Sequence, residues 1–523
     1  MSKVDGVWSI SVKGPTGEQK TELVLQTVDG KLTGTQSGKG APQPISNAAV
    51  EGDKISWINH VTSPIKMKVE FKATLSGEQM SGKIKAGLMG SYRFSGYRIS
   101  RDVADASAID ESEENSTEDP FIAMLAKTDP IPDLHYLRST DPVHFVAPFG
   151  FWVITRHDDI QRLFNDPENV THIKLEWNLY TPHPEGSMRK WSDENAIHAL
   201  APAEHSRLRR LTTAAFTPRA VARMDQQIKE VVKQLIDPLR GREGETIDIM
   251  GEFTNKVPNV VISRITGITP GADEVRFCEI AQAVVQGGLP FISDEVRQES
   301  ERGFVEFAAW IRDLVKQRRR NPQEDLVSDL IRAQDADQNL SEDDIVLLLA
   351  SLIGAGSEAT AMVATLAIKA LLENPIVMAR LRDDRAQIRK SIDEIIRYAF
   401  SIPPGTMRFA VRDFDLRGKK ISKGQMLMLS AGGANRDPKK YEKPDDLNLN
   451  LDRVVQTRQL TFGHGPNFCV GVNLAKEEIA SMITALLDVI PAGSRICESR
   501  IEYRDMGIMK QAISLPVFIG PPA

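Results

Sequence analysis

The chain has 523 residues, of which 41% are hydrophobic and 26% charged, and its formal net charge is -6. This length allows two or more domains with a large core, and the composition is typical of a soluble globular protein. The acidic balance argues against nucleic-acid binding, which favours a basic patch. Cys278, Cys469 and Cys497 form neither a disulfide framework nor a zinc pattern, so we expect a cytoplasmic protein. The N-terminus has no basic region followed by an apolar one, so no signal peptide is expected.

Residues 1–100 are predicted to form a small all-β domain, either a barrel or a sandwich. Short alternating runs such as VWSISV and MKVEFKATL are separated by glycine-containing turns, the pattern of strands joined by hairpins. We expect Trp8, Trp57, Phe71 and Phe94 to pack in its core, since packing is commoner than a ligand cage. The domain is interpreted as a docking module for substrate or redox partner, with a role in solubility or stability as the alternative.

Residues 101–119, RDVADASAIDESEENSTED, are acidic and poor in large apolar side chains. This composition predicts a flexible linker between two domains. A docking tail for a basic partner is the alternative.

From residue 120 to residue 523 the apolar spacing is that of helices. One apolar segment, residues 345–372, is long enough to span a membrane. Ser357, Glu358 and Thr360 at its centre favour a buried core helix and no membrane insertion. Helices are predicted at 205–216, 222–239, 303–320, 345–372, 386–400 and 472–490, and short strands at 151–156 and 425–431.

A glycine-rich segment around Cys469, FGHGPNFCVG at 462–471, carries the strongest sign of chemistry. Gly465 and Gly471 let the backbone bend tightly and approach a large flat ligand. The helix predicted from residue 472 directs free N–H groups and its positive dipole end toward the sulfur, so we expect a lowered thiol pKa at Cys469. A thiolate is a soft ligand suited to iron.

This segment resembles the haem-binding loop of the cytochrome P450 family, F-x-x-G-x-x-x-C-x-G, with Phe462, Gly465, Cys469 and Gly471 in its four places. The resemblance covers about residues 120–523. It implies a mainly α fold with small β-sheets around haem b, and it makes Cys469 the axial ligand of the iron. A thiolate in that place pushes electron density onto the iron and favours O–O cleavage.

A second motif, Glu394-Ile395-Ile396-Arg397, resembles the E-x-x-R pair of the family. Residues three apart share a helix face, so the carboxylate and the guanidinium can meet. The resemblance implies a buried charge network that includes Arg453 and supports the haem loop.

The centre of the long apolar helix, AGSEAT at 355–360, resembles the oxygen-activation segment of the family. The resemblance implies that Ala355 and Gly356 leave room beside the haem for O2 and that Glu358 relays protons. The threonine that usually follows the acid comes one residue late, at Thr360, and one residue turns a helical side chain by about 100°. Thr360 therefore need not point at the oxygen, and ordered water or a substrate hydroxyl can deliver protons instead.

His205 and Arg209 lie four residues apart and share a helix face. The resemblance implies that this pair binds the haem propionates and that Arg408 contacts a propionate from the strand after E-x-x-R. Many bacterial members carry histidine two residues before the cysteine. This chain has Asn467 there, which can donate a hydrogen bond but carries no charge.

The resemblance implies a bacterial-type monooxygenase that inserts one atom of O2 into a hydrophobic or moderately polar organic substrate. The sequence contains no dinucleotide fingerprint and no iron–sulfur cysteine set, so a separate ferredoxin and ferredoxin reductase are expected to supply electrons. Lys476 and Arg453 are candidates for docking this partner, with ordinary surface charge as the alternative. Two other functions stay open: a haem–thiolate peroxygenase, isomerase or dehydratase, and a non-catalytic protein that binds ligands in the haem pocket.

Overall fold

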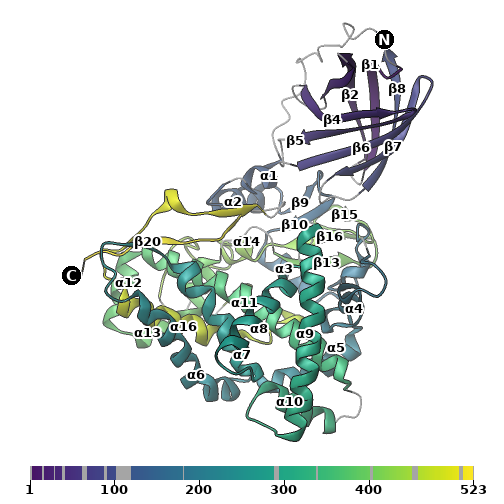
Figure 1. Cartoon of the computed structure of the whole chain (residues 1–523). Helices are drawn as coiled ribbons and strands as arrows, with labels where there is room; N and C mark the ends of the chain where they lie inside the picture. The colour runs from purple at the N-terminus through teal and green to yellow at the C-terminus, as the bar shows by residue number, and fades with distance from the viewer. Residues whose placement is uncertain are drawn as a thin grey trace. The chain divides into compact units, whose positions relative to one another are not determined.

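A closed antiparallel β-barrel forms the N-terminal part of the computed structural model (Figure 1). Its strands follow one another in chain order, and the first closes the barrel by pairing with the last, with Trp8 opposite Arg98. Of the two architectures predicted for residues 1–100, the barrel is confirmed. The strands are β1 Gly6–Gly14, β2 Gly17–Val28, β3 Lys31–Ser37, β4 Gln43–Glu51, β5 Lys54–Val61, β6 Met67–Ser76, β7 Gln79–Ala86 and β8 Ser91–Ser100.

The structure describes most of the chain, and all statements below concern this part. The described residues are 3–14, 17–28, 30–37, 42–61, 67–86, 91–101, 119–125, 127–180, 182–287, 294–336, 340–400, 405–449, 457–505 and 510–521.

Aromatic side chains fill the barrel, as predicted for Trp8, Trp57, Phe71 and Phe94, each of which is at most 5% exposed. The rings of Trp57 and Phe71 stack with centroids 4.6 Å apart, and Phe94 meets both rings edge-on. Such pairs add to the free energy gained from burying apolar area. The four residues therefore act as packing rather than as a ligand cage.

Strand β4 is the one barrel strand that was not among the predicted alternating runs. Its sequence, QPISNAAVE, has mixed burial, and its pairing with β5 shifts register between Ser46 and Ala49. Asn47 within this shift has φ of 49°, the left-handed conformation that asparagine tolerates better than most residues. The bulge interrupts the two-residue alternation, which is why the pattern was not recognised in the sequence.

The chain divides into two compact units, one of Met1–Ala126 with Phe145–Phe151 and the other of Lys127–His144 with Trp152–Ala523. The first short helix, α1 Pro120–Leu125, falls in the N-terminal unit, although residue 120 was the predicted start of the second domain. Most of the predicted linker, residues 102–118, lies outside the described residues.

The larger unit is mainly helical, with small sheets. The six predicted helices are confirmed as α5, α6, α9, α11, α13 and α16, with ends that differ by a few residues except at the start of α9. The longer helices are α2 Ile131–Thr140, α3 His157–Phe164, α4 Met188–Asn195, α5 Pro202–Ala215, α6 Pro218–Ile236, α7 Lys256–Thr266, α8 Ala272–Gln286, α9 Asp294–Arg320, α10 Leu326–Ala336, α11 Glu342–Glu373, α12 Pro375–Asp383, α13 Ala386–Ala399 and α16 Val472–Val489. Shorter turns are η3 Lys174–Glu176, η4 Ile197–Ala199, η5 Asp237–Leu239, η6 Met250–Thr254, α14 Ala431–Asn435, η7 Gly465–Asn467 and η8 Glu498–Arg500.

The largest sheet outside the barrel has the strand order β11-β13-β16-β10-β9, and its strand β13 carries Arg408. A three-stranded sheet, β12-β20-β17, and two hairpins, β14-β15 and β18-β19, complete the β-structure. The strands are β9 Val143–Val146, β10 Phe151–Ile154, β11 Val170–Thr171, β12 Thr246–Asp248, β13 Thr406–Ala410, β14 Phe414–Leu416, β15 Lys419–Ile421, β16 Met426–Leu429, β17 Arg495–Ile496, β18 Tyr503–Asp505, β19 Lys510–Ala512 and β20 Pro516–Phe518.

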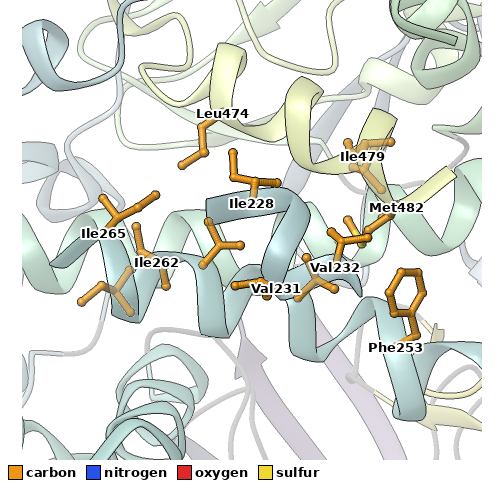
Figure 2. Close-up of a cluster of buried hydrophobic side chains, with 14 of the residues drawn as sticks. Ile228, Val231, Val232, Phe253, Ile262, Ile265, Leu474, Ile479 and Met482 are labelled. Carbon is orange, nitrogen blue, oxygen red and sulfur yellow. The ribbon is translucent and has the colours of Figure 1, made fainter. Parts of the chain in front are cut away.

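One continuous hydrophobic core holds α16, which follows the candidate haem loop, against α6, α11 and α13. Figure 2 shows Ile228 and Val232 of α6 facing Leu474, Ile479 and Met482 of α16. These side chains are at most 6% exposed. Full burial of one aliphatic side chain contributes about 1.5–3 kcal/mol. The helix that begins just after Cys469 is thereby fixed by packing.

Helix α11 is the core helix that was expected from residues 345–372. It begins with a capping box in which Ser341 and Asp344 satisfy each other's backbone N–H groups. Within the described part of the chain it is the one helix long and apolar enough to cross a membrane, and half of its most apolar window is buried in protein. Burial against α7, α13 and α16 explains its apolar character without a bilayer.

Candidate functional site

The segment 462–471 forms a tight loop that ends at the start of α16. The Cys469 N–H donates to the Phe462 carbonyl at 2.9 Å, and the Phe468 N–H donates to the Gly465 carbonyl at 3.0 Å. Gly465 has φ of 69°, and a Cβ there would lie 2.5 Å from the Asn165 Oδ1 atom. Glycine is therefore required at 465 both by conformation and by space.

The loop leaves space next to Cys469. A Cβ at Gly471 would meet no atom within 4 Å, and the apolar side chains of Phe462 and Val470 are only partly buried. Apolar side chains beside open space fit a large flat ligand.

The thiol of Cys469 departs from the expectation of a lowered pKa. Burial raises the pKa of Cys469, and the Gly471 N–H and the Arg209 charge lower it by less. Desolvation of the charged sulfur thus outweighs the helix end in the protein alone. A bound metal ion supplies the positive charge that deprotonates a coordinating thiol.

Cationic side chains gather beside the loop. Arg209 of α5 donates to the Phe468 carbonyl, one residue before the cysteine. His205, one turn earlier on α5, is 8% exposed, and Arg408 of β13 is 5% exposed. Burial alone lowers the pKa of Arg408 to about 10, and the Phe164 ring lies 4.8 Å from its guanidinium carbon. A buried arginine with no carboxylate partner among the described residues is costly unless an anion completes its surroundings.

His172, which was not among the predicted site residues, lies beside these basic side chains. Its ring lies 5.2 Å from the His205 ring, and its Nε2 atom is buried without a hydrogen-bond partner among the described residues. Burial, then the charges of His205, Arg408 and His198, lower the pKa of His172 to about 4. No sequence motif marks it, because it follows β11 and reaches the site only through the fold.

These side chains fit the two carboxylates of haem b. Arg209 and Arg408 supply positive charge and donors, His205 and His172 supply ring N–H donors, and no carboxylate contributes to the pKa shift of any of the four. Asn467, in η7, is partly buried in the same loop and completes the predicted set.

Glu394 and Arg397 form the buried pair that their spacing predicts. They are 1% and 0% exposed, and two hydrogen bonds of 2.7 and 2.9 Å join the guanidinium to the carboxylate. Arg397 also donates to the carbonyls of Asn435, Pro444 and Asp446. Arg453, the expected third member, lies outside the described residues.

Asn435 links this hydrogen-bond network to the residues just before the haem loop. Its side chain accepts a hydrogen bond from the Leu460 N–H and donates to the Thr461 hydroxyl, at 2.8 and 2.9 Å. Helix α13 is thereby connected through buried hydrogen bonds to the residues just before Phe462. A buried, fully hydrogen-bonded network of this kind rigidifies its surroundings.

The middle of α11 opens toward space on one side. Ala355 and Ala359 are exposed although the helix is a core helix, and a Cβ at Gly356 would meet nothing within 4 Å. Glu358 is half-buried, whereas Thr360 is 7% exposed. On an ideal helix Thr360 lies about 100° around from Ala359 and so faces away from this open side.

The loop at 171–198 carries a polar cluster. Asp193 accepts hydrogen bonds from the Tyr180 hydroxyl at 2.8 Å and from Lys174 at 3.1 Å, and His183 lies 3.6 Å away. Burial lowers the pKa of His183 to about 4, against the opposing charge of Asp193. The cluster gives this loop a fixed internal structure.

Comparison with known proteins agrees with this arrangement. Polyketide biosynthesis cytochrome P450 PksS from Bacillus subtilis (strain 168) is 30% identical over 399 residues, which cover 74% of this chain and 95% of the relative. Mycinamicin IV hydroxylase/epoxidase from Micromonospora griseorubida is 30% identical over 387 residues, covering 73% and 93%. The solved structure of epothilone D-bound cytochrome P450epoK has a TM-score of 0.68 at 25% identity and covers 76% of this chain and 98% of that chain.

The family model described as Cytochrome P450 matches residues 151–489, which include every described candidate residue of the site. The predicted fold, a mainly α domain with small sheets preceded by a β-barrel, is confirmed. The chain belongs to the cytochrome P450 family and is a monooxygenase with haem b as its cofactor.

Proposed function

We propose that Cys469 would ligate the haem iron through its sulfur and that His172, His205, Arg209 and Arg408 would hold the haem propionates. The observation that carries this proposal is the gathering of two arginines and two histidines, with no carboxylate contributing to their pKa shifts, beside a cysteine loop with open space. With haem bound, the iron activates O2, one atom of which enters the substrate while the other leaves as water.

The residues around the cysteine have positioning roles in this proposal. Phe462, Gly465 and Gly471 shape the loop, and Asn467 donates a hydrogen bond near the propionates without adding charge. Glu394 and Arg397, with Arg453 as a predicted third member, hold the loop in place through Asn435. A loop fixed in this way would hold the Cys469 sulfur in one position for binding iron.

In the middle of α11, we assign proton transfer to Glu358 and the O2 space to Ala355 and Gly356. Glu358 lies next to the open side of α11, and the two small residues leave that side free. Thr360 is buried on another face, so it acts on the proton path only through ordered water or a change in the helix. A substrate hydroxyl or water in the open space at Ala359 takes the place of the usual threonine.

The substrate is proposed to be a hydrophobic or moderately polar organic molecule. Alanine and glycine line the open side of α11, and the loop at 171–198 adds polar groups at its surface. Relatives named as a hydroxylase/epoxidase and as an epothilone C/D epoxidase support oxygen insertion into such molecules.

We propose that the enzyme works in the cytoplasm with a separate ferredoxin and ferredoxin reductase. We also propose three parts of the chain: a barrel at residues 1–100, a linker at 101–119 and the haem domain at 120–523. A peroxygenase, isomerase or dehydratase reaction is the alternative, because alanine replaces the usual threonine at 359. Turnover with a ferredoxin system would support the monooxygenase reaction, and turnover with hydrogen peroxide alone would support a peroxygenase.

The experiment that tests the haem assignment is the spectrum of the dithionite-reduced protein with carbon monoxide. The wild type and Cys278→Ala are expected to give the Soret band typical of a thiolate-ligated haem, and Cys469→Ala is expected to lose it. Cys278 is a matched control, because it is a free cysteine whose pKa burial raises to about 11. A band that persists in Cys469→Ala would disprove the assigned ligand.

A further inference from the structure

His198 is an exposed histidine that neither the haem assignment nor the proton path uses. It lies in η4, between α4 and α5. The side chains of Ile197 and Leu200 pack against the hydrophobic core. In a turn of this kind, residues three apart lie on the same side, so the packing directs the His198 side chain away from the core. The turn thereby holds the imidazole ring in a fixed place.

The His198 ring faces a recess rather than the outer surface of the protein. His198 is exposed, yet burial is the largest cause of its lowered pKa. The charge of Asp193 opposes this shift, and the charges of Lys174 and Arg189 add to it. Desolvation of an imidazole requires protein atoms on most of its sides. A ring that water can reach but that protein surrounds lies in the wall of a recess.

The recess adjoins the middle of α11. Both η4 and α4 lie against α11. Arg189 of α4 donates to the Val284 carbonyl of α8 at 2.5 Å. A Cβ at Gly354 of α11 would lie 3.5 Å from the side chain of the neighbouring Val285. Helix α4 therefore comes close to α11 next to Ala355, where α11 has its open side, and η4 follows directly after α4.

Both nitrogens of the His198 ring are available for hydrogen bonds. Within the part of the chain that the structure describes, this ring forms no hydrogen bond. Asp193, the carboxylate whose charge acts on it, already accepts hydrogen bonds from Tyr180 and Lys174. A neutral imidazole carries one donor and one acceptor. The ring can therefore bind a hydroxyl group in either direction or donate to a carbonyl oxygen.

We propose that His198 recognises a hydroxyl or carbonyl oxygen of the substrate and thereby helps to determine which molecules the enzyme oxidises. This inference rests on the proposed function, because it takes the open side of α11 as the place where the substrate reacts. Ala355 and Ala359 are exposed on α11 but offer no polar group. In an apolar pocket, a few well-placed polar groups fix the orientation of a ligand. His198 supplies such a group.

The charges around the recess favour a neutral oxygen over a carboxylate. Lys174 is paired with Asp193, with 3.1 Å between Nζ and Oδ2. The Arg189 guanidinium donates to the Val284 carbonyl and to the Ser300 hydroxyl, at 2.5 and 2.9 Å. A substrate carboxylate would thus meet a neutral imidazole and two cations that already have partners. Burying a charge without a partner is costly, so an uncharged substrate oxygen fits the recess better.

The test compares three ring compounds of one size, cyclododecanol, cyclododecanone and cyclododecane, on the full-length, haem-loaded protein. Dissociation constants are taken from the change in Soret absorbance on titration. The ratio of the constant for cyclododecane to that for an oxygenated ring is expected to fall about three- to tenfold in His198→Phe, because only the oxygenated rings lose a hydrogen bond. His198→Gln, which keeps a donor and an acceptor, should retain most of the ratio. His60→Phe, which changes an exposed histidine of the barrel, should leave it unchanged.

The ratio separates recognition from a structural role, because damage to the pocket would weaken all three compounds alike. An unchanged ratio in His198→Phe for both oxygenated rings, an equal fall in His60→Phe, or no binding of any ring by the wild type would overturn the proposal. Faster haem loss from His198→Phe than from the wild type would also overturn it, since His198 would then hold a propionate. Each sample is first checked for the Soret band of its reduced carbon monoxide complex, so failure of the Cys469 assignment is seen separately.

Discussion

Replacing His172 tests the proposed haem cradle most directly. The His172 Nε2 atom is buried without a partner among the described residues, and its ring lies 5.2 Å from that of His205. A hydrogen bond to a charged group contributes about 1.5–3 kcal/mol. If His172 donates to a propionate, His172→Phe should therefore raise the haem dissociation constant by about 10- to 150-fold. His172→Gln, which keeps a donor, should recover part of this loss.

The assay is the rate of haem transfer to excess apomyoglobin, followed by the Soret absorbance. His198→Phe is the matched control, since His198 is an exposed histidine of the same loop whose neighbouring charges include Asp193. The haem-free His172→Phe protein should be as stable to urea as the wild type, because no hydrogen bond of this Nε2 atom is lost. A transfer rate within about twofold of the wild type, or an equal increase in His198→Phe, would refute the role of His172.

Three further predictions concern stability and haem content. Arg397→Met should lower the free energy of unfolding of the haem domain by about 3–5 kcal/mol in urea, because it leaves Glu394 charged at 1% exposure, and Glu394→Leu/Arg397→Met should recover most of this. A double variant no more stable than the single one would contradict this. Gly465→Ala should lower the haem-to-protein ratio, because residue 465 has φ of 69° and a Cβ there would lie 2.5 Å from Asn165 Oδ1. The control Gly493→Ala should leave the ratio unchanged, because a Cβ at residue 493 would meet no atom within 4 Å. Burial lowers the pKa values of His172 and His183 to about 4 in the folded, haem-free protein. Between pH 4 and the unfolded pKa, both histidines therefore stay neutral in the folded protein but bind protons in the unfolded chain. The free energy of unfolding of the haem-free protein should then be constant above the unfolded pKa of about 6.5 and fall as the pH drops toward 4. In urea titrations at several pH values, the variant His172→Phe/His183→Phe should show a smaller decline.

Local patterns in the sequence were sufficient for much of the fold and for the centre of the site. The loop around Cys469 could be recognised because its glycines and cysteine act through backbone bends within ten residues. Glu394 and Arg397 could be paired because three residues bring side chains to one face of a helix. The barrel strands could be predicted where apolar and polar residues alternate, and β4 was missed where a bulge at Asn47 breaks that alternation.

Other properties depend on distances between segments that are far apart in the chain, and these only the tertiary structure decided. His172 joins His205 and Arg408 because β11 pairs with β13 and α5 packs nearby, which no local spacing encodes. Thiol pKa is a balance of burial against local donors, so the expected lowering at Cys469 was wrong once its burial was known. The desolvation of His198 likewise arises only from the packing around η4, since electrostatic energy and desolvation depend on separation in space rather than along the sequence.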